Sequence, residues 1–271
     1  MSKLYDKYNN ILTHKEKTLD GWINKYYFYE TPISVLINNP TMVKPAPKQV
    51  FCFWTGYNKL TPNRLKCLDS IKHNIGIDVK LITNNNLDKY IIKGHSIHPA
   101  YKYLSETCKG DYLKAYFMHF YGGGYTDIKH TDSNWNLWFD NLNNSNKWIN
   151  GYKHGAGHTL GKNNQRTLSI SRIGCLFQIG TTLHICKPNT PITSEWFLRL
   201  HQILDNKLDL LIKNPSKDTR DELGKKLSDG SISKYPITWG ELNADILGDI
   251  LWKYRDKILQ EMSFPNFSDY I

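Results

Sequence analysis

Two apolar runs on either side of a helical segment constrain the fold of this 271-residue chain more than any other feature. Residues 49–54 (QVFCFW) are almost continuously apolar, which is typical of a buried strand in a parallel sheet. Residues 62–75 repeat leucine and isoleucine at helical spacing, and residues 79–82 (VKLI) have the pattern of a second strand. A strand, a helix and a strand in this order predict an α/β fold with a Rossmann-like half.

The most informative segment is KGDYLKAYFMHFYGGGYTDIKHT, residues 109–131. Apolar side chains recur at i, i+3, i+4 and i+7 and predict a helix with one buried face; they are Leu113, Tyr116, Phe117 and Phe120. Asp111 suits the N-cap or the first turn of that helix. The three glycines 122–124 are expected to end it, and residues 125–129 to follow as an extended segment.

The second half of the chain is less regular. Its predicted elements, in chain order, are a glycine- and histidine-rich loop at 151–161, one or two strands within 175–186, an amphipathic helix over 195–211, a charged loop over 215–230 and a helix over 239–259. No repeat and no sharp change in composition divides the chain. We therefore expect an N-terminal extension (1–45) and one domain (46–271), with a nucleotide half (46–140) and an acceptor half (141–271).

Composition and charge exclude several classes of protein. No run approaches the roughly 20 apolar residues of a membrane span, so the chain is expected to be cytoplasmic, without a transmembrane segment. The five cysteines are odd in number and form no CxxC pair, which argues against a disulfide framework or a zinc ribbon. The net charge of +10 attracts anions, but the lysines and arginines are scattered, so nucleic acid is not the expected partner.

Two acid and lysine pairs lie in the 109–131 segment. Alternate side chains of an extended segment face the same way, so Asp127 and Lys129 are predicted to point into one cleft. Asp111 and Lys114 are three residues apart on the predicted helix and share a face distinct from the apolar one. The alternative interpretation is a tight turn with an ordinary surface ion pair, worth about 0 to 1 kcal/mol.

The motifs GDYLK (110–114) and YGGGYTDIK (121–129) resemble the donor-site signature of nucleotide-sugar glycosyltransferases of the GT-A fold. The similar groups are the capsular polysaccharide synthesis and DxD sugar-transferase families. A weaker likeness covers about residues 48–255 through QVFCFWTG, KPNTPITSEWF and YPITWGEL. The resemblance implies a GT-A-like single domain with a Rossmann-like nucleotide-binding half and a mixed central sheet.

By position, the resemblance implies that Asp111 contacts the nucleoside, that Lys114 replaces an arginine near the diphosphate, and that Asp127 is the first acid of DxD. Lys129 occupies the place of the last acid, whose family counterpart helps to bind a divalent metal. If Mn²⁺ or Mg²⁺ is bound, Asp127 is its expected ligand. Metal-independent activity is at least as strongly expected, because an ammonium group at Lys129 can supply positive charge to the departing phosphate.

Further candidate site residues come from the ends of predicted elements. Donor-binding candidates are Trp54, Thr55, Gly56 and Asn84 at strand ends, with Gly123, Gly124 and Tyr125 around the glycine turn. Glu241 is the candidate general base of an inverting transfer, although Glu241, Asp245 and Asp249 also have the spacing of a solvated helix face, on which Asp249 pairs with Lys253. His158 and His184 are candidates for the acceptor side; glycines around His158 argue against a zinc site.

These observations predict a hexosyl- or pentosyltransferase that moves a sugar from a nucleoside-diphosphate sugar to a hydroxyl of a glycan or polysaccharide acceptor, as in capsule biosynthesis. Two alternatives stay open. A catalytically inactive protein that binds nucleotide sugars or carbohydrates explains the altered DxD motif as decay. A basic nucleic-acid-binding module explains the net charge.

Overall fold

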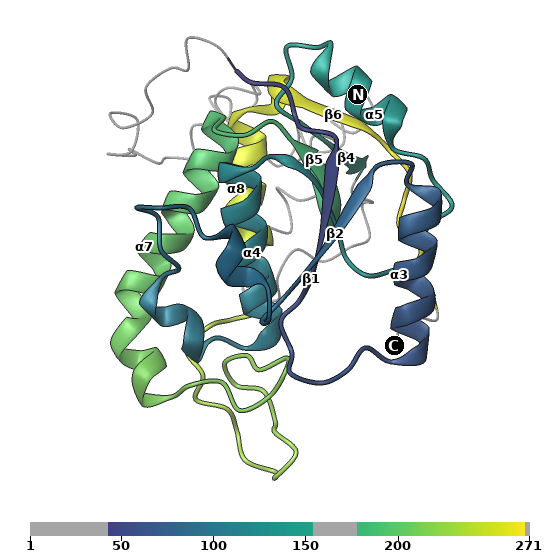
Figure 1. The fold of residues 1–271 in the computed structure, drawn as a ribbon. Coiled ribbons are helices and arrows are strands. Elements are labelled where there is room, and N and C mark those ends of the chain that lie inside the picture. Colours follow the sequence, from purple (N-terminus) through teal and green to yellow (C-terminus); the bar gives the residue numbers. More distant parts are fainter. Residues whose placement is uncertain (1–42, 154–177, 269–271) are drawn as a thin grey trace, which may run out of the picture.

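The computed structural model describes residues 43–153 and 178–268 of the chain. A six-stranded mixed sheet lies at its centre, with the strand order β2-β1-β3-β5-β4-β6 (Figure 1). The strands are β1 (Gln49–Trp54), β2 (Asp78–Thr83), β3 (Gly123–Thr126), β4 (Ile149–Lys153), β5 (Ile179–Cys186) and β6 (Ile258–Met262). The molecule therefore has a mixed α/β architecture with a mixed central sheet, as the sequence predicts.

The first half of the sheet is parallel. Strand β1 pairs in parallel with β2 on one side and with β3 on the other. Helix α3 (Pro62–Asn74) connects β1 to β2, and helix α4 (Glu106–Phe120) precedes β3. The connection through α3 runs from β1 to β2, and the connection through α4 runs from β2 past β1 to β3. The parallel pairing of β1 with β2 across α3 confirms the predicted strand, helix and strand unit.

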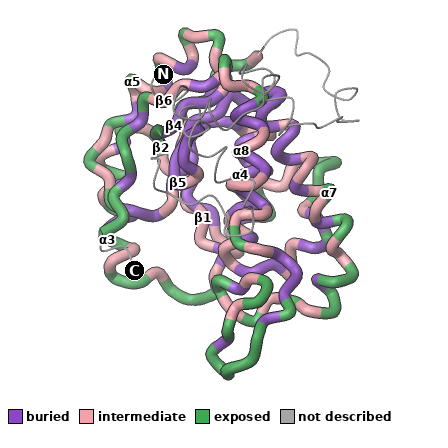
Figure 2. The backbone as a smooth tube through the Cα atoms, turned by 180° about the vertical axis from the view of Figure 1, so that it is seen from behind, coloured by how far each residue is buried: buried purple, intermediate pink, exposed green. Residues whose placement is uncertain are grey.

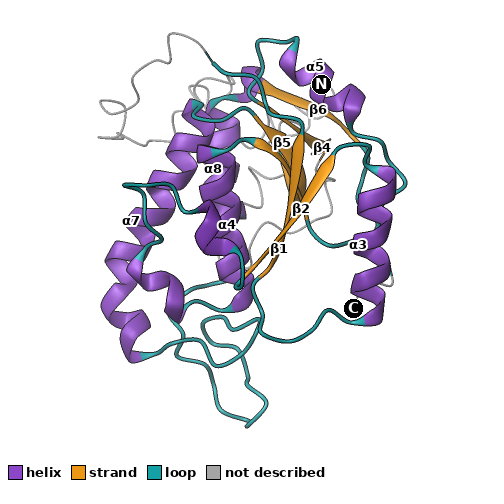
Figure 3. Cartoon of the chain, viewed as in Figure 1, coloured by secondary structure: helices purple, strands orange, loops and turns teal. Residues whose placement is uncertain are grey.

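Two layers of helices cover the sheet (Figure 3). Helices α3 and α5 (Asn136–Asn143) pack on one face, and α4, α7 (Pro191–Lys213) and α8 (Ala244–Lys253) pack on the other. The central strands and α4 are buried, whereas much of α3 and of the loops is exposed (Figure 2). Because α4 lies between the sheet and α7, it is buried over most of its circumference rather than on the single face predicted.

Two predicted boundaries are wrong for identifiable reasons. Helix α4 begins earlier than expected, at Glu106, because Ser105 is its N-cap and accepts a hydrogen bond from the backbone N–H of Cys108 at 3.3 Å. Asp111 therefore lies inside the helix and is not its cap. Helix α7 likewise begins at Pro191, where Thr190 provides a capping box and proline suits the first turn.

The predicted helix over 239–259 is wrong at both ends. Gly240 has a φ of +84°, so the chain turns before α8 begins at Ala244. After α8 a short 3₁₀ turn leads into β6, whose Ile258 pairs with Ile149 of β4. The apolar side chains at the end of this segment thus belong to a strand. Among residues 43–153 and 178–268, no helix is both long and apolar enough to cross a membrane.

Candidate functional site

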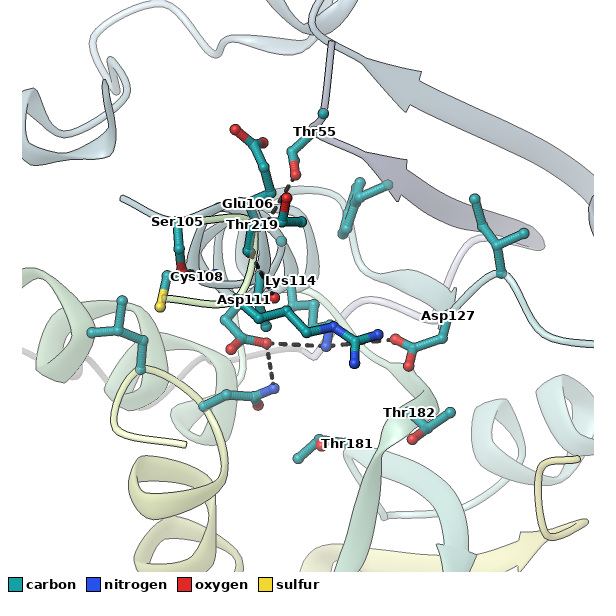
Figure 4. Close-up of a pocket in the computed structure, with 18 of the residues that line it drawn as sticks. Thr55, Ser105, Glu106, Cys108, Asp111, Lys114, Asp127, Thr181, Thr182 and Thr219 are labelled. Carbon is teal, nitrogen blue, oxygen red and sulfur yellow. Dashed lines mark hydrogen bonds and ion pairs between the residues drawn. The ribbon is translucent and has the colours of Figure 1, made fainter. Parts of the chain in front are cut away.

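A cavity of about 520 Å³ opens at the carboxyl ends of β1 and β3. The strand order reverses here, because β2 lies on one side of β1 and β3 lies on the other. Open α/β sheets bind ligands at such a switch point. The volume is within the range of roughly 300 to 1,000 Å³ that is usual for small-molecule sites. The lining comes from the end of β1, the first turns of α4, the segment after β3, the start of β5 and the loops around residues 220 and 240. Figure 4 shows Asp111, Lys114 and Asp127 on the wall of this cavity, with Thr181 and Thr182 of β5 nearby.

Asp127 is the centre of a charge cluster in this cavity. The Lys129 ammonium lies 2.6 Å from Oδ2 of Asp127, and the Lys114 ammonium lies 3.7 Å from Oδ1. The Tyr125 hydroxyl donates a hydrogen bond to Oδ1 at 2.5 Å. Both ammonium groups are nearly buried, with side chains 8% and 10% exposed. The predicted juxtaposition of Asp127 with Lys129 is confirmed, and Lys114 joins the same carboxylate from the neighbouring helix.

The charges in this cluster stabilise one another. Burial by itself would raise the pKa of Asp127, but the ammonium groups of Lys114 and Lys129 outweigh it and lower that pKa to about 2. Burial would lower the pKa of Lys114, yet Asp111 and Asp127 raise it above its ordinary value. Burial and the adjacent Asp127 raise the pKa of Tyr125 well above its ordinary value, so its hydroxyl is a hydrogen-bond donor at neutral pH. Asp127 and Lys114 therefore stay ionised across the physiological range.

The second predicted pair lies on α4, with the Lys114 ammonium 3.1 Å from Oδ1 of Asp111. The side-chain amide of Asn243 donates to the same oxygen at 2.7 Å. Sequence reasoning did not identify Asn243, because it is 132 residues from Asp111 and no local pattern marks it. Lys114 thus bridges the carboxylates of Asp111 and Asp127, and the two predicted pairs form one continuous cluster.

The end of β1 forms another wall of the cavity. Trp54, Thr55 and Gly56, which the sequence gives as donor-binding candidates, all line it. The Thr55 hydroxyl donates to the backbone oxygen of Glu106 at 2.9 Å, which fixes the end of β1 against the start of α4. Asn84 is outside the lining, and its amide donates to the backbone oxygen of Thr55 at 2.6 Å. Asn84 therefore stabilises the end of β1 through this hydrogen bond and does not face the cavity.

The glycines of the triplet contact other parts of the protein. A Cβ on Gly123 would lie 2.7 Å from the backbone oxygen of Gln49, and a Cβ on Gly124 would lie 2.9 Å from the Trp135 ring. Neither glycine is among the residues that line the cavity, whereas Tyr125 is. Close packing of β3 against β1 and against the start of α5 thus accounts for both glycines.

Of the remaining predicted residues, Glu241 and His184 lie away from the cavity wall. Oε1 of Glu241 is 2.5 Å from the Lys207 ammonium, and the side chain lies outside the lining. His184 is fully buried on β5 between Tyr125 and Trp196, and burial lowers its pKa to about 3. His158 falls outside the described residues.

The predicted carboxylate stripe is also arranged differently from the expectation. Glu241 precedes α8, and Asp249 is 3.6 Å from Arg199 of α7 rather than paired with Lys253. Lys253 instead contacts the buried Glu195 at 2.9 Å. Glu241 and Asp249 thus face α7 and pair with its cationic side chains, so these two carboxylates do not form a solvated surface.

Several lining residues were not predicted from the sequence. Arg64 of α3 donates to the backbone oxygen of Ile128 at 2.6 Å and places a guanidinium beside the segment after β3. Arg220, Trp239 and Phe267 reach the cavity from loops and from the C-terminal segment. For Arg64 a signal was available, because the helix that follows the first strand of a Rossmann-like half begins near the ligand. The loop residues carry no such signal.

The donor atoms around Asp127 do not fit a divalent metal. Mn²⁺ and Mg²⁺ need several free oxygen ligands, but Oδ1 of Asp127 contacts Tyr125 and Lys114, and Oδ2 contacts Lys129. A metal on this carboxylate would lie close to two ammonium groups of like charge. Within the two described stretches, no group of three or more histidine, cysteine or acidic side chains has the arrangement of a metal site.

The sequence was also compared with known proteins. No protein-family model matches it, and a search of curated proteins found no match. Inferences about function therefore depend on the geometry of the cavity and on the motifs of the chain.

Proposed function

We propose that this protein is a glycosyltransferase with a GT-A-like fold, which moves a sugar from a nucleoside-diphosphate sugar to a hydroxyl of a glycan acceptor. One observation carries the proposal: Lys114 and Lys129 place two nearly buried ammonium groups on Asp127, in a cavity at the switch point of the sheet. Rossmann-like halves bind the phosphates of nucleotides at this position. The motif likeness of residues 110–129 to the donor sites of sugar transferases supports the same assignment.

The chemistry of sugar transfer gives these ammonium groups a task. As the bond between the anomeric carbon and the diphosphate breaks, negative charge grows on the leaving phosphate oxygen. Fixed cations that are already in place stabilise that charge without reorganisation. The contacts of Lys129 and Lys114 with Asp127 hold both ammonium groups near one point. The acceptor oxygen forms its new bond to the anomeric carbon as the bond to the diphosphate breaks, and the hydroxyl proton is released to solvent.

In this proposal Lys129 supplies charge that a divalent metal provides in related enzymes. The ammonium group of lysine is a compact point charge on a flexible stem, so it can move from Asp127 to a phosphate oxygen when the donor binds. Asp127 then acts as the counter-ion that keeps Lys129 in place before binding. Transfer is expected to continue in the presence of excess chelator.

A second candidate is a binding protein without turnover. Both oxygens of Asp127 are engaged by neighbouring groups, which also fits a site that retains nucleotide sugars but has lost catalysis. Such a protein would bind donors with affinity similar to that of an enzyme. It would release neither free sugar nor transferred sugar.

A panel of nucleoside diphosphates and their sugars, with Mn²⁺ or with EDTA, tests the proposal. Thermal shift measures binding, and release of nucleoside diphosphate measures turnover. We expect stabilisation by a diphosphate nucleotide in EDTA, and its loss in Lys129→Met, but not in Lys48→Met, where a lysine pairs with Asp140 on the surface. Binding without any turnover would favour the second candidate. If no nucleotide stabilises the wild type, the proposed function is wrong.

A further inference from the structure

Two exposed aromatic side chains lie at the rim of the cavity. Trp239 is 52% exposed and Phe267 is 43% exposed, and both belong to the lining. Large aromatic side chains usually gain stability by burial, so their exposure at a cavity mouth offers apolar surface that a ligand can cover. The inner part of the same cavity is charged, with Asp127 and Lys129. The cavity thus combines apolar edges with a strongly polar interior.

Trp239 is held in a fixed loop. The carboxylate of Glu241 accepts hydrogen bonds from the backbone N–H of Thr238 at 2.9 Å and from its hydroxyl at 3.2 Å. The other oxygen of Glu241 is 2.5 Å from the Lys207 ammonium on α7. Glu241 therefore ties the residue before Trp239 to the body of the protein. A ligand that stacks on this indole loses little free energy to ordering of the loop.

Phe267 lies beside the charge cluster. Its ring centroid is 5.2 Å from the Lys129 ammonium, and its ring packs against Phe264 at 5.6 Å. Phe264 in turn contacts Tyr152 of β4 at 5.3 Å. This chain of contacts fixes the C-terminal segment against the sheet. Phe267 consequently borders the place where the proposed diphosphate leaves.

We propose that Trp239 and Phe267 form the acceptor subsite and stack on the apolar face of a pyranose ring. The inference rests on the proposed function, because it takes Asp127 and Lys129 as the diphosphate end of the site. A pyranose with mainly equatorial hydroxyls presents a face of axial C–H bonds, which fits an aromatic ring, and an edge of hydroxyls, which fits polar partners. The nucleobase has another aromatic candidate, Trp54, on the wall formed by β1.

This arrangement gives Glu241 a different task from general base. It is a positioning residue that acts through the loop of Trp239, because its carboxylate contacts Thr238 and Lys207. Replacing it by glutamine keeps one acceptor oxygen but removes the ion pair. Glu241→Gln is therefore expected to raise the acceptor KM while leaving the pH profile of kcat unchanged, whereas loss of a general base would change that profile.

The test measures sugar binding separately from turnover. Saturation-transfer NMR on the full chain, loaded with the nucleoside diphosphate that stabilises it most, is recorded with methyl glycosides of glucose, galactose, mannose and N-acetylglucosamine. We expect at least one glycoside to bind, with the strongest transfer to axial C–H protons of one ring face. Trp239→Ala should weaken that binding at least tenfold, about 1.4 kcal/mol, and Trp239→Phe should restore most of it.

Control variants separate this inference from the proposed function. Ile232 is 61% exposed but lies outside the cavity lining, so Ile232→Ala should leave glycoside binding unchanged. Phe267→Ala should likewise weaken glycoside binding. The inference is overturned if no glycoside in the panel binds, or if Trp239→Ala and Phe267→Ala bind it like the wild type. If glycosides bind at this rim but no nucleotide binds, the proposed function fails and the carbohydrate subsite stands.

Discussion

Asp127→Asn is the most direct perturbation of the charge cluster. In the folded protein the pKa of Asp127 is about 2, against an ordinary value of 3.8. A group with a lowered pKa contributes stability that is complete above its unfolded pKa and is lost as the pH falls through its folded pKa. The difference of roughly two pKa units corresponds to about 2 kcal/mol at pH 7 and about half of that at pH 3. Asparagine removes this contribution at every pH.

Urea unfolding of the wild type and Asp127→Asn between pH 7 and pH 3 measures this effect. We expect the gap between their free energies of unfolding to be about 2 kcal/mol at pH 7 and to narrow to about 1 kcal/mol at pH 3. Other carboxylates titrate in both proteins, so the gap isolates Asp127. Asp140→Asn is the matched control, because Asp140 pairs with Lys48 at 2.8 Å on the surface, where such pairs contribute about 0 to 1 kcal/mol. A gap that stays constant over this pH range would refute the reasoning.

Three further predictions concern buried groups. Glu195 is fully buried and contacts Arg199, Lys253 and Tyr254, so Glu195→Gln should lower the free energy of unfolding in urea by about 3 to 5 kcal/mol; a loss below about 1 kcal/mol would contradict a buried network. Gly124→Ala should lower the free energy of unfolding in urea by about 1 to 3 kcal/mol, because the added Cβ would lie 2.9 Å from Trp135. Gly110→Ala is its control and should be neutral or stabilising, because the space around its Cβ is open. In the folded protein the pKa of His184 is about 3, so between pH 8 and pH 5 the unfolded chain takes up a proton at His184 and the folded protein does not. His184→Leu should therefore reduce the loss of thermal stability over this pH range. If the variant and the wild type lose stability equally, a buried neutral imidazole is contradicted.

Local periodicity predicted the first half of the fold well. The apolar run of β1 and the helical spacing of α3 specify elements whose partners are close in sequence. The end of the chain was harder, because Ile258 and Met262 have the same apolar character in a helix as in a strand. Their parallel pairing with β4, more than 100 residues earlier, decides between the two.

The candidate site was predictable only where its contacts are short in sequence. Asp127 and Lys129 are together, although not as alternate residues of a strand: β3 ends at Thr126, and the backbone N–H of Lys129 bonds to the oxygen of Asp127 at 2.8 Å. The tight turn gives the same juxtaposition for a different reason. Asn243 reaches Asp111 across the molecule, and no local pattern can encode such a contact. His184 was placed near the acceptor by its sequence neighbours, but β5 is an inner strand and encloses it.

The distribution of charge separates the proposed function from the nucleic-acid alternative. Among the described residues, the cavity lining contains four cationic and four acidic side chains: Arg64, Lys114, Lys129 and Arg220 against Glu106, Asp111, Asp127 and Asp221. The net charge of +10 therefore arises outside the lining. A polyanion attracted by that excess would bind through many phosphate contacts, and its affinity would fall steeply with salt. A nucleotide inside the cavity would replace Asp127 as the anion that the buried ammonium groups of Lys114 and Lys129 contact. Its affinity should change little between low and physiological salt, because buried charges are screened far less than exposed ones.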